Sequence, residues 1–378
     1  MPLESATIDV ASRQGLEGLA IVDCDVHPDA NADVVRHLPE RWRQYVELTG
    51  FRGWPTETMI RLTNRPMANR LDTTPPGGGI AGSDPDFARE QLLDEYGLSY
   101  AILNNISLCS GGMPGEFEVE LARATNDYNE TWLEADPRWL SSINVYALNP
   151  GASVREVERC RMKSDRFVQV LLDTHLERPA GNPVYWPVFE AAEALGLPVA
   201  FHITGRSKHG KSSGVGPVTY YYEQRTSLDI LGQTVVPSLI FEGTFDRFPK
   251  LKVALIEMDW TWVVPMAWRL DATWRVLRDE VPDLQRKPSE YLRDHFWFST
   301  QPNLEPERPE QFYEAYDQFV RAGFGDRLMF ATDYPHWDMD SPFESTPRDL
   351  PRESKQRILS GNAAALYGLD LSAGENAL

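Results

Sequence analysis

The sequence has few cysteines and no long apolar run. Cysteine occurs three times in 378 residues, at Cys24, Cys109 and Cys160, which is too few and too scattered for a disulfide framework or a thiolate zinc site. No stretch approaches the roughly 18 to 20 continuous apolar residues of a membrane span. The N-terminal segment MPLESATIDVASRQG has neither the basic nor the apolar region of a secretory signal. These absences favour a reducing, bacterial-type cytoplasm and argue against a membrane as partner.

Basic side chains are scarce relative to acidic ones. Lys and Arg number 37 while Asp and Glu number 56, so the formal net charge is −19. Nucleic acids and anionic membranes are bound through broad basic faces, and neither is expected as a main partner. Hydrophobic residues make up 42% of the chain and charged residues 25%, as is usual for globular proteins. We therefore expect a globular protein whose substrate is a small molecule. A homo-oligomer is a separate expectation, and it does not follow from the composition.

Short apolar runs alternate with longer helical patterns along the whole chain. This alternation predicts a parallel sheet with crossover helices, and eight such runs predict one domain, residues 1–378, folded as a (β/α)8 TIM barrel. The predicted strands are Ala20–Asp25, Tyr100–Leu103, Ser142–Tyr146, Val168–Leu172, Pro198–His202, Val253–Ile256, Phe296–Ser299 and Leu328–Ala331. The predicted helices include Gly115–Ala135, Val154–Lys163, Val184–Leu195, Trp260–Asp279, Pro309–Ala322 and Arg352–Leu366.

Two segments interrupt this alternation. Residues 49–84 are rich in Gly, Pro and Thr and contain the run PPGGG, and residues 205–222 are rich in Gly and Ser. Long loops in a compact domain are usually functional or disordered. We expect both segments to be insertions that fold over the C-terminal face of the barrel.

Residues of metal-ligand type stand at the ends of three predicted strands. Asp25 and His27 close the first strand in VDCDVHP, and they point the same way because residues two apart share a face of a strand. His202 closes the fifth strand in VAFH, and Asp333 follows the eighth in FATDYPH. Active sites of TIM barrels lie at the carboxyl ends of the strands, where such residues converge. The sequence therefore predicts a metal site built from these four side chains.

This constellation resembles the amidohydrolase-related superfamily, specifically the branch of aminocarboxymuconate-semialdehyde decarboxylase and the resorcylate decarboxylases. The resemblance extends from Asp23 to the GNAA turn before the last helix. In that family the first strand carries H-x-H or E-x-H, the fifth strand a His, and the eighth an Asp within a T/S-D-Y-P phrase. The matching positions here are Asp25 and His27, His202, and Asp333. The resemblance implies a metal-dependent enzyme on a TIM barrel.

The sixth strand departs from the family pattern. Family members keep a His there for acid–base chemistry, in a G-H-M-G-E type phrase, whereas the matching position here is Glu257 in IEMD. The fourth strand also lacks the carboxylated Lys that bridges the metals of binuclear amidohydrolases. A carboxylate can bridge equally well, so Glu257 is a candidate catalytic residue and a candidate ligand to a second metal. Alternatively, it orients a ligand His or pairs with an Arg of the barrel.

His336 follows Asp333 after one short turn. At that position it could coordinate a metal, bind substrate or form only a hydrogen bond. We count it with Asp333 and Glu257 as a candidate catalytic residue. The full candidate ligand set is Asp25, His27, His202, Glu257, Asp333 and His336. A set of carboxylates and imidazoles without thiolates suits iron or manganese.

A basic stretch, RSKHGKSSG, lies shortly after His202 and contains Arg206, Lys208 and Lys211. In a strongly acidic chain, such a cluster with accessible backbone N–H groups suits an anion, for example the phosphates of a coenzyme A thioester. The alternative is a solvated surface loop. His175, at the end of the fourth predicted strand, is expected to line the substrate pocket.

Two enzyme functions and one non-enzymatic role follow from these residues. The Asp-x-His pair and Glu257 resemble the TIM-barrel nonheme diiron monooxygenases of platensimycin-type diterpenoid biosynthesis. That resemblance implies two iron ions, O2, an electron donor, and hydroxylation of a coenzyme-A-linked, terpenoid substrate. The alternative is a mononuclear zinc- or manganese-dependent hydrolase or decarboxylase. A non-catalytic barrel is disfavoured, because the ligand residues would then serve no common purpose.

The basic stretch gives a testable prediction. If Arg206, Lys208 and Lys211 bind coenzyme A phosphates, changing all three to Ala should raise KM for a thioester, most strongly at low salt, because salt screens exposed charges. The kcat should change little, since phosphate binding is equally strong in the ground and transition states. Steady-state kinetics of both proteins at two ionic strengths measure the effect. Equal KM values would contradict the assignment of a thioester site.

Overall fold

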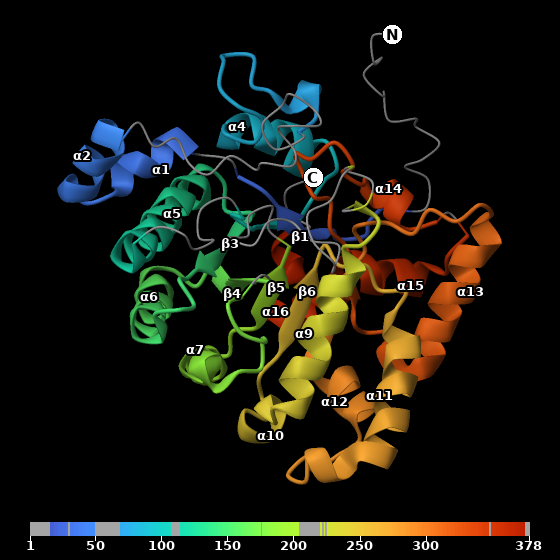
Figure 1. Ribbon diagram of the computed structural model, residues 1–378. Helices are drawn as coiled ribbons and strands as arrows, with labels where there is room; N and C mark the ends of the chain where they lie inside the picture. Colours follow the sequence, from blue (N-terminus) through green and yellow to red (C-terminus); the bar gives the residue numbers. More distant parts are fainter. Residues whose placement is uncertain are drawn as a thin grey trace.

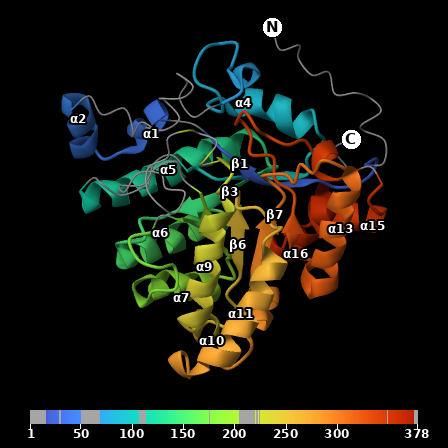
Figure 2. The same cartoon turned by 45° about the vertical axis from the view of Figure 1, so that its right-hand side comes forward.

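Eight parallel strands form a single sheet with the spatial order β1 to β8. The computed structural model describes residues 16–28, 31–49, 69–106, 114–174, 176–203, 220, 223, 225–347 and 349–374. The strands are β1 (Val22–Val26), β2 (Tyr100–Leu103), β3 (Trp139–Asn144), β4 (Phe167–Asp173), β5 (Val199–His202), β6 (Val253–Ile256), β7 (Phe296–Ser299) and β8 (Leu328–Met329). Helices lie on the outside of the sheet in both views (Figure 1, Figure 2).

Main-chain hydrogen bonds bring the first and last strands together. The N–H of Cys24 donates to the carbonyl of Phe330 at 3.0 Å, and the N–H of His27 donates to the carbonyl of Tyr334 at 2.8 Å. The sheet is therefore a nearly closed barrel. This confirms the predicted (β/α)8 fold, in which every strand runs in the same direction and the carboxyl ends of all eight strands meet on one face.

The α-helices of the described residues are α1 (Asn31–His37), α2 (Glu40–Thr49), α4 (Pro85–Ala88), α5 (Gly115–Ala135), α6 (Pro150–Lys163), α7 (Trp186–Ala194), α9 (Asp229–Phe241), α10 (Thr244–Arg247), α11 (Val263–Leu277), α12 (Pro288–His295), α13 (Pro309–Phe319), α14 (Pro342–Ser345), α15 (Arg352–Gln356) and α16 (Asn362–Tyr367). Short 3-10 or π segments are η2 (Leu71–Thr73), η3 (Arg89–Asp94), η4 (Pro183–Tyr185), η5 (Arg278–Glu280), η6 (Val320–Phe324), η7 (Arg357–Gly361) and η8 (Leu371–Gly374).

Several predicted boundaries were wrong, among them the start of β3, which lies at Trp139 and not at Ser142, and the start of α6, which lies at Pro150 and not at Val154. Two others have a local reason. Strand β3 ends at Asn144, before the predicted Tyr146, because the carbonyl of Tyr146 is already used in the turn that leads to α6. Helix α11 begins only at Val263, because the Asp259 carboxylate accepts hydrogen bonds from the two N–H groups that follow it and holds a turn there. The predicted helix from Arg352 is divided into α15, η7 and α16.

The interior of the barrel is filled by apolar side chains from alternate strand positions. Ala200 on β5 and both Ala254 and Ile256 on β6 belong to this inner cluster, whereas their sequence neighbours pack outward against the helices. Helix α16 adds Leu366 to the same cluster. The hydroxyl of Tyr100, the first residue of β2, donates to a carbonyl just beyond α16. The C-terminal segment thus covers the amino ends of the strands, opposite the face on which their carboxyl ends meet.

Part of the first predicted insertion lies against the carboxyl ends of the strands. Asn69 forms an isolated antiparallel bridge with His336, and the N–H of Arg70 donates to the carbonyl of Pro335 at 2.9 Å. A Cβ at Gly82 would lie 2.8 Å from the carbonyl oxygen of His27. The described part of this segment, residues 69–82, therefore lies over one side of the face formed by the carboxyl ends of the strands. Of the second predicted insertion, residues 205–222, all but one residue lie outside the described residues.

No helix among the described residues has both the length and the apolar character needed to cross a membrane.

The contact between the loop after β4 and helix α9 gives a stability prediction. The N–H of Gly181 donates to the Ser238 hydroxyl, and a Cβ at this glycine would overlap the Ser238 carbonyl. Gly181→Ala should therefore lower the free energy of unfolding by about 1 to 3 kcal/mol, as overpacking typically does. Gly77→Ala is the matched control, because a Cβ there meets nothing within 4 Å. Chemical denaturation of the two variants measures the difference, and equal unfolding midpoints would contradict the prediction.

Candidate metal centre

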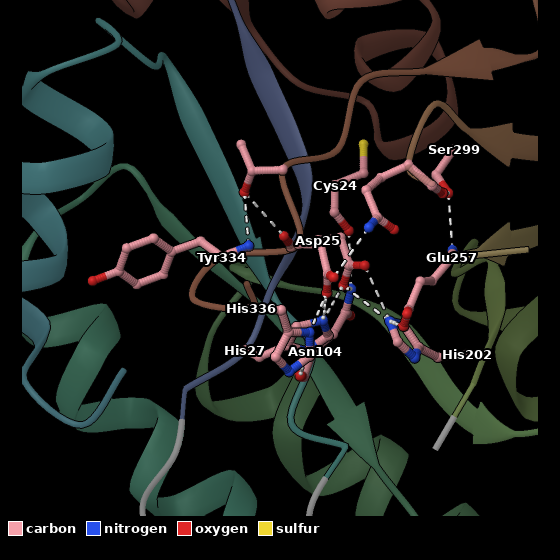
Figure 3. A network of polar contacts seen from close by, with 12 residues as sticks. Cys24, Asp25, His27, Asn104, His202, Glu257, Ser299, Tyr334 and His336 are labelled. Carbon is pink, nitrogen blue, oxygen red and sulfur yellow. Dashed lines mark hydrogen bonds and ion pairs between the residues drawn. The ribbon is translucent and has the colours of Figure 1, made fainter. Parts of the chain in front are cut away.

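The two predicted ligands of β1 lie side by side at its carboxyl end. Asp25 is fully buried and His27 is 3% exposed. The His202 Nε2 atom, at the end of β5, lies 3.1 Å from each carboxylate oxygen of Asp25. The two imidazole rings meet edge to face, with centroids 4.9 Å apart. Figure 3 shows these side chains converging from different strands on one point.

The His27 ring is oriented so that one nitrogen is free to bind a cation. Its Nδ1 lies 2.8 Å from the carbonyl oxygen of Asn104, which fixes the proton on that nitrogen. Its Nε2 lies 2.8 Å from Asp333 and 3.2 Å from Asp25, yet this buried atom makes no well-directed hydrogen bond. Because Nε2 lies between two carboxylates, a cation bound by them would also meet this nitrogen.

Asp333 and His336 complete the other side of the centre. His336 Nδ1 lies 2.6 Å from Asp333 Oδ1, and the His336 ring stacks on His27 with centroids 4.6 Å apart. Gln301 donates from Nε2 to the second oxygen of Asp333 at 3.1 Å. Because its oxygens are held by separate partners, the Asp333 carboxylate has one orientation in the centre.

Glu257 reaches the centre from the turn after β6. Its N–H donates to the Ser299 hydroxyl at 2.9 Å, and its carboxylate oxygen lies 3.7 Å from His202 Nε2. Figure 3 shows the side chain directed toward the His202 ring. Glu257 and Asp333 have φ angles of 60° and 63°, a left-handed conformation that costs a residue with a Cβ about 1 to 3 kcal/mol. The fold thus tolerates backbone strain at two positions that direct carboxylates inward.

The six candidate ligands form two overlapping groups. In each group, one donor atom per residue lies within 4.8 Å of all the others. The first group is Asp25, His27, His202 and Glu257, and the second is His27, Asp333 and His336. The structure therefore brings together all six residues predicted from sequence. Their roles as ligands or catalytic residues remain predictions. His175, Arg206, Lys208 and Lys211 lie outside the described residues.

Sequence reasoning missed the residues that support the ligands. The buried Asp23 carboxylate accepts hydrogen bonds from the N–H of Asp25 and from both the N–H and the hydroxyl of Thr332, which ties β1 to the segment after β8. Asn104 donates to Asp25 from the end of β2. Only their positions in the sequence could have pointed to them. Asp23 lies on the same strand face as Asp25, and Asn104 directly follows an apolar strand.

Burial and neighbouring charges shift the pKa values of Asp25 and His27 in opposite directions, and that of Glu257 in the same direction. Burial alone would raise the pKa of Asp25, but His202 and His27 outweigh it and hold that pKa below its usual range. Burial would lower the pKa of His27, but Asp25 and Asp333 raise it well above its ordinary value. Burial, followed by the charges of Asp333 and Asp25, raises the pKa of Glu257 well above its ordinary value. Without a metal, His27 and Glu257 therefore retain protons to higher pH than usual.

A divalent cation must displace these protons, which predicts pH-dependent metal binding. Groups with a raised pKa are protonated over a wider range, so the affinity for Mn²⁺ should weaken as pH falls from about 8 to 6, with protons released on binding. Calorimetric titration of metal-stripped protein in buffers of different ionisation enthalpy measures both effects. His27→Ala is the control, and it should bind weakly at either pH. An affinity independent of pH, without proton release, would contradict the prediction.

Comparisons with known proteins indicate the family of this chain. Residues 22–369 match the family model described as Amidohydrolase. The chain is 27% identical over 302 residues to gamma-resorcylate decarboxylase of Polaromonas sp. strain JS666, a match that covers 75% of this chain and 87% of that protein. The crystal structure of 5-carboxyvanillate decarboxylase LigW from Sphingomonas paucimobilis is similar with a TM-score of 0.67 and 22% identity, covering 93% of this chain and 100% of that one.

Another similar structure was solved with a metal. The dihydroxybenzoic acid decarboxylase of Polaromonas sp. JS666, with bound manganese and the inhibitor 2-nitroresorcinol, has a TM-score of 0.63 and 20% identity, and the match covers 93% of this chain and 97% of that one. Structural likeness at such identities shows the fold. These relatives do not support the expected closeness to diiron monooxygenases. Because the family match extends over residues 22–369, the chain belongs to the Amidohydrolase family, and its relatives include decarboxylases.

Proposed function

We propose that this protein is a metal-dependent decarboxylase that removes CO2 from a small carboxylic acid. The observation that carries the proposal is the group formed by the buried Asp25, His27 and His202 and the partly buried Glu257 at the carboxyl ends of the strands, with donor atoms within 4.8 Å of one another. The family match and the similarity to gamma-resorcylate decarboxylase support it. A hydroxylated aromatic acid is the substrate class that this relative suggests.

The donor set suits one manganese ion. Asp25, His27, His202 and Asp333 would hold the ion, since carboxylate and imidazole donors without thiolates are typical of manganese sites. The manganese in the related dihydroxybenzoic acid decarboxylase supports this choice. A bound divalent cation supplies a positive charge that stabilises negative charge developing on the substrate.

The protein's own residues must supply a proton. Decarboxylation breaks the bond between the carboxyl group and the adjacent carbon, CO2 leaves, and that carbon takes up a proton. Glu257 is suited to this role, because burial, aided by the charges of Asp333 and Asp25, raises the pKa of its carboxyl well above the ordinary value and favours the protonated form. His336, held through Nδ1 by Asp333, has Nε2 left to orient a polar group of the substrate.

A second candidate function, a nonheme diiron monooxygenase, is favoured by the overlap of the two ligand groups. His27 belongs to both, and the second group adds Asp333 and His336. Two adjoining groups are compatible with two iron ions, and a Glu257 anion would offset part of their charge. This function also requires O2, an electron donor and a coenzyme-A-linked substrate. The basic stretch proposed to bind that substrate lies outside the described residues.

Glu257→Gln is predicted to distinguish the two functions, because it preserves size but removes both the proton and the anion. For the decarboxylase, the variant should retain one metal and lose kcat by about 10²- to 10⁴-fold, as general acids typically do. For the monooxygenase, the iron content should fall from two towards one and substrate-coupled O2 uptake should cease. Glu242→Gln, an exposed residue after α9, is the control and should behave as wild type.

The measurements are metal content after anaerobic purification, CO2 release from 2,6-dihydroxybenzoate and related acids, and O2 uptake. Release of CO2 by the manganese-loaded wild type, with little by Glu257→Gln, is the expected result. Two iron atoms per chain with O2 uptake would instead support the monooxygenase and overturn the decarboxylase.

A further inference from the structure

A chain of buried polar side chains crosses the barrel interior and ends at a candidate metal ligand. Asn104, fully buried after β2, donates from Nδ2 to Asp25 Oδ1 at 2.9 Å and to the carbonyl of Cys24 at 2.9 Å. Its own carbonyl oxygen lies 2.8 Å from His27 Nδ1. One residue therefore contacts both ligands of β1, the carboxylate through its side chain and the imidazole through its main chain (Figure 3).

The orientation of the Asn104 amide is determined by donors on its other side. Asn104 Oδ1 accepts from the Ser142 hydroxyl at 2.5 Å and from Gln169 Nε2 at 3.0 Å. Gln169 Nε2 also donates to the Ser142 hydroxyl at 2.8 Å. If the Asn104 amide turned over, its oxygen would face the Asp25 carboxylate and its NH2 group would face two donors. Ser142 and Gln169 thus keep the NH2 group of Asn104 on Asp25.

The chain begins at the opposite end of the barrel. Tyr367, the last residue of α16, donates from its hydroxyl to Gln169 Oε1 at 2.8 Å. Burial raises the pKa of this phenol well above its ordinary value, so it remains a donor. With Oε1 occupied by this donor, Gln169 must direct its NH2 group toward Asn104. Each side chain in this series therefore donates to the next one: Tyr367 to Gln169, Gln169 to Asn104, and Asn104 to Asp25.

We propose that Asn104 is a positioning residue that presets Asp25 and His27 for the metal, and that Tyr367 sets its orientation through Gln169. Groups behind metal ligands fix the rotamer of a ligating carboxylate and the tautomer of a ligating imidazole, and their loss typically reduces metal affinity by about 10- to 100-fold. This inference rests on the proposed metal centre. It assigns to the C-terminal helix a role in preorganising that centre, in addition to its packing role.

The test is the Kd for Mn²⁺ of metal-stripped, full-length protein, measured by titration, together with the Tm of the metal-free form. Asn104→Ala should raise the Kd by about 10- to 100-fold, and Tyr367→Phe should raise it by a smaller factor. Asn126→Ala is the matched control. Asn126 is also fully buried and donates from Nδ2 to the Asn144 carbonyl and to Glu156, between α5 and α6. It should lose Tm but keep the wild-type Kd.

The outcomes separate positioning from general stability. A raised Kd in Asn104→Ala and Tyr367→Phe, with a wild-type Kd in Asn126→Ala, supports the proposal. An unchanged Kd in Asn104→Ala overturns it, as does an equal rise in all three variants, which would make fold stability the cause. If wild-type protein itself fails to bind Mn²⁺, the metal centre of the proposed function is overturned together with this inference.

Discussion

Several carboxylates are buried close together at the carboxyl ends of the strands, and the centre depends on partners that offset the unfavourable free energy of burying their negative charge. Asp23, Asp25 and Asp333 are all fully buried, and Glu257 lies beside them. An isolated charge in such surroundings is strongly unfavourable unless it is paired and hydrogen-bonded. Here the oxygens of the three aspartates are met by imidazoles, side-chain amides, main-chain N–H groups and the Thr332 hydroxyl. Asp25 and Asp333 also raise the pKa of His27. A divalent cation is the natural counter-charge of this arrangement.

The closure of the barrel makes that compensation geometrically possible. Asp23 receives donors from Thr332, and the N–H of Asp333 donates to the carbonyl of Asp25 at 3.0 Å, so β1 and the segment after β8 are held in one register. The same register brings Asp333 and His27 within 2.8 Å of each other. The contacts that close the barrel therefore also bring the candidate ligands together. This agrees with the general position of active sites in this fold, at the carboxyl ends of the strands.

The chemistry proposed for the centre depends on Glu257, which follows β6 at the position where the resemblance led us to expect a His. An imidazole at that position would titrate near neutral pH, whereas the buried carboxyl of Glu257 has its pKa raised by burial and by its acidic neighbours. It can therefore serve as a proton donor in its neutral form or as an anionic ligand once a cation displaces the proton. The proposed decarboxylase would use the neutral form of Glu257, and the alternative diiron monooxygenase would use the anionic form.

The sequence by itself determined the parallel barrel, because apolar strands alternate with helical patterns, and the candidate ligands, because Asp25, His27, His202 and Asp333 stand at strand ends. Tertiary structure decided which remote side chains support them. Asn104 contacts Asp25 across 79 positions, and Tyr367 contacts Gln169 across 198. Single-strand patterns carry no information about partners on other strands, since these pairings arise only when the barrel closes and the last helix covers its amino end.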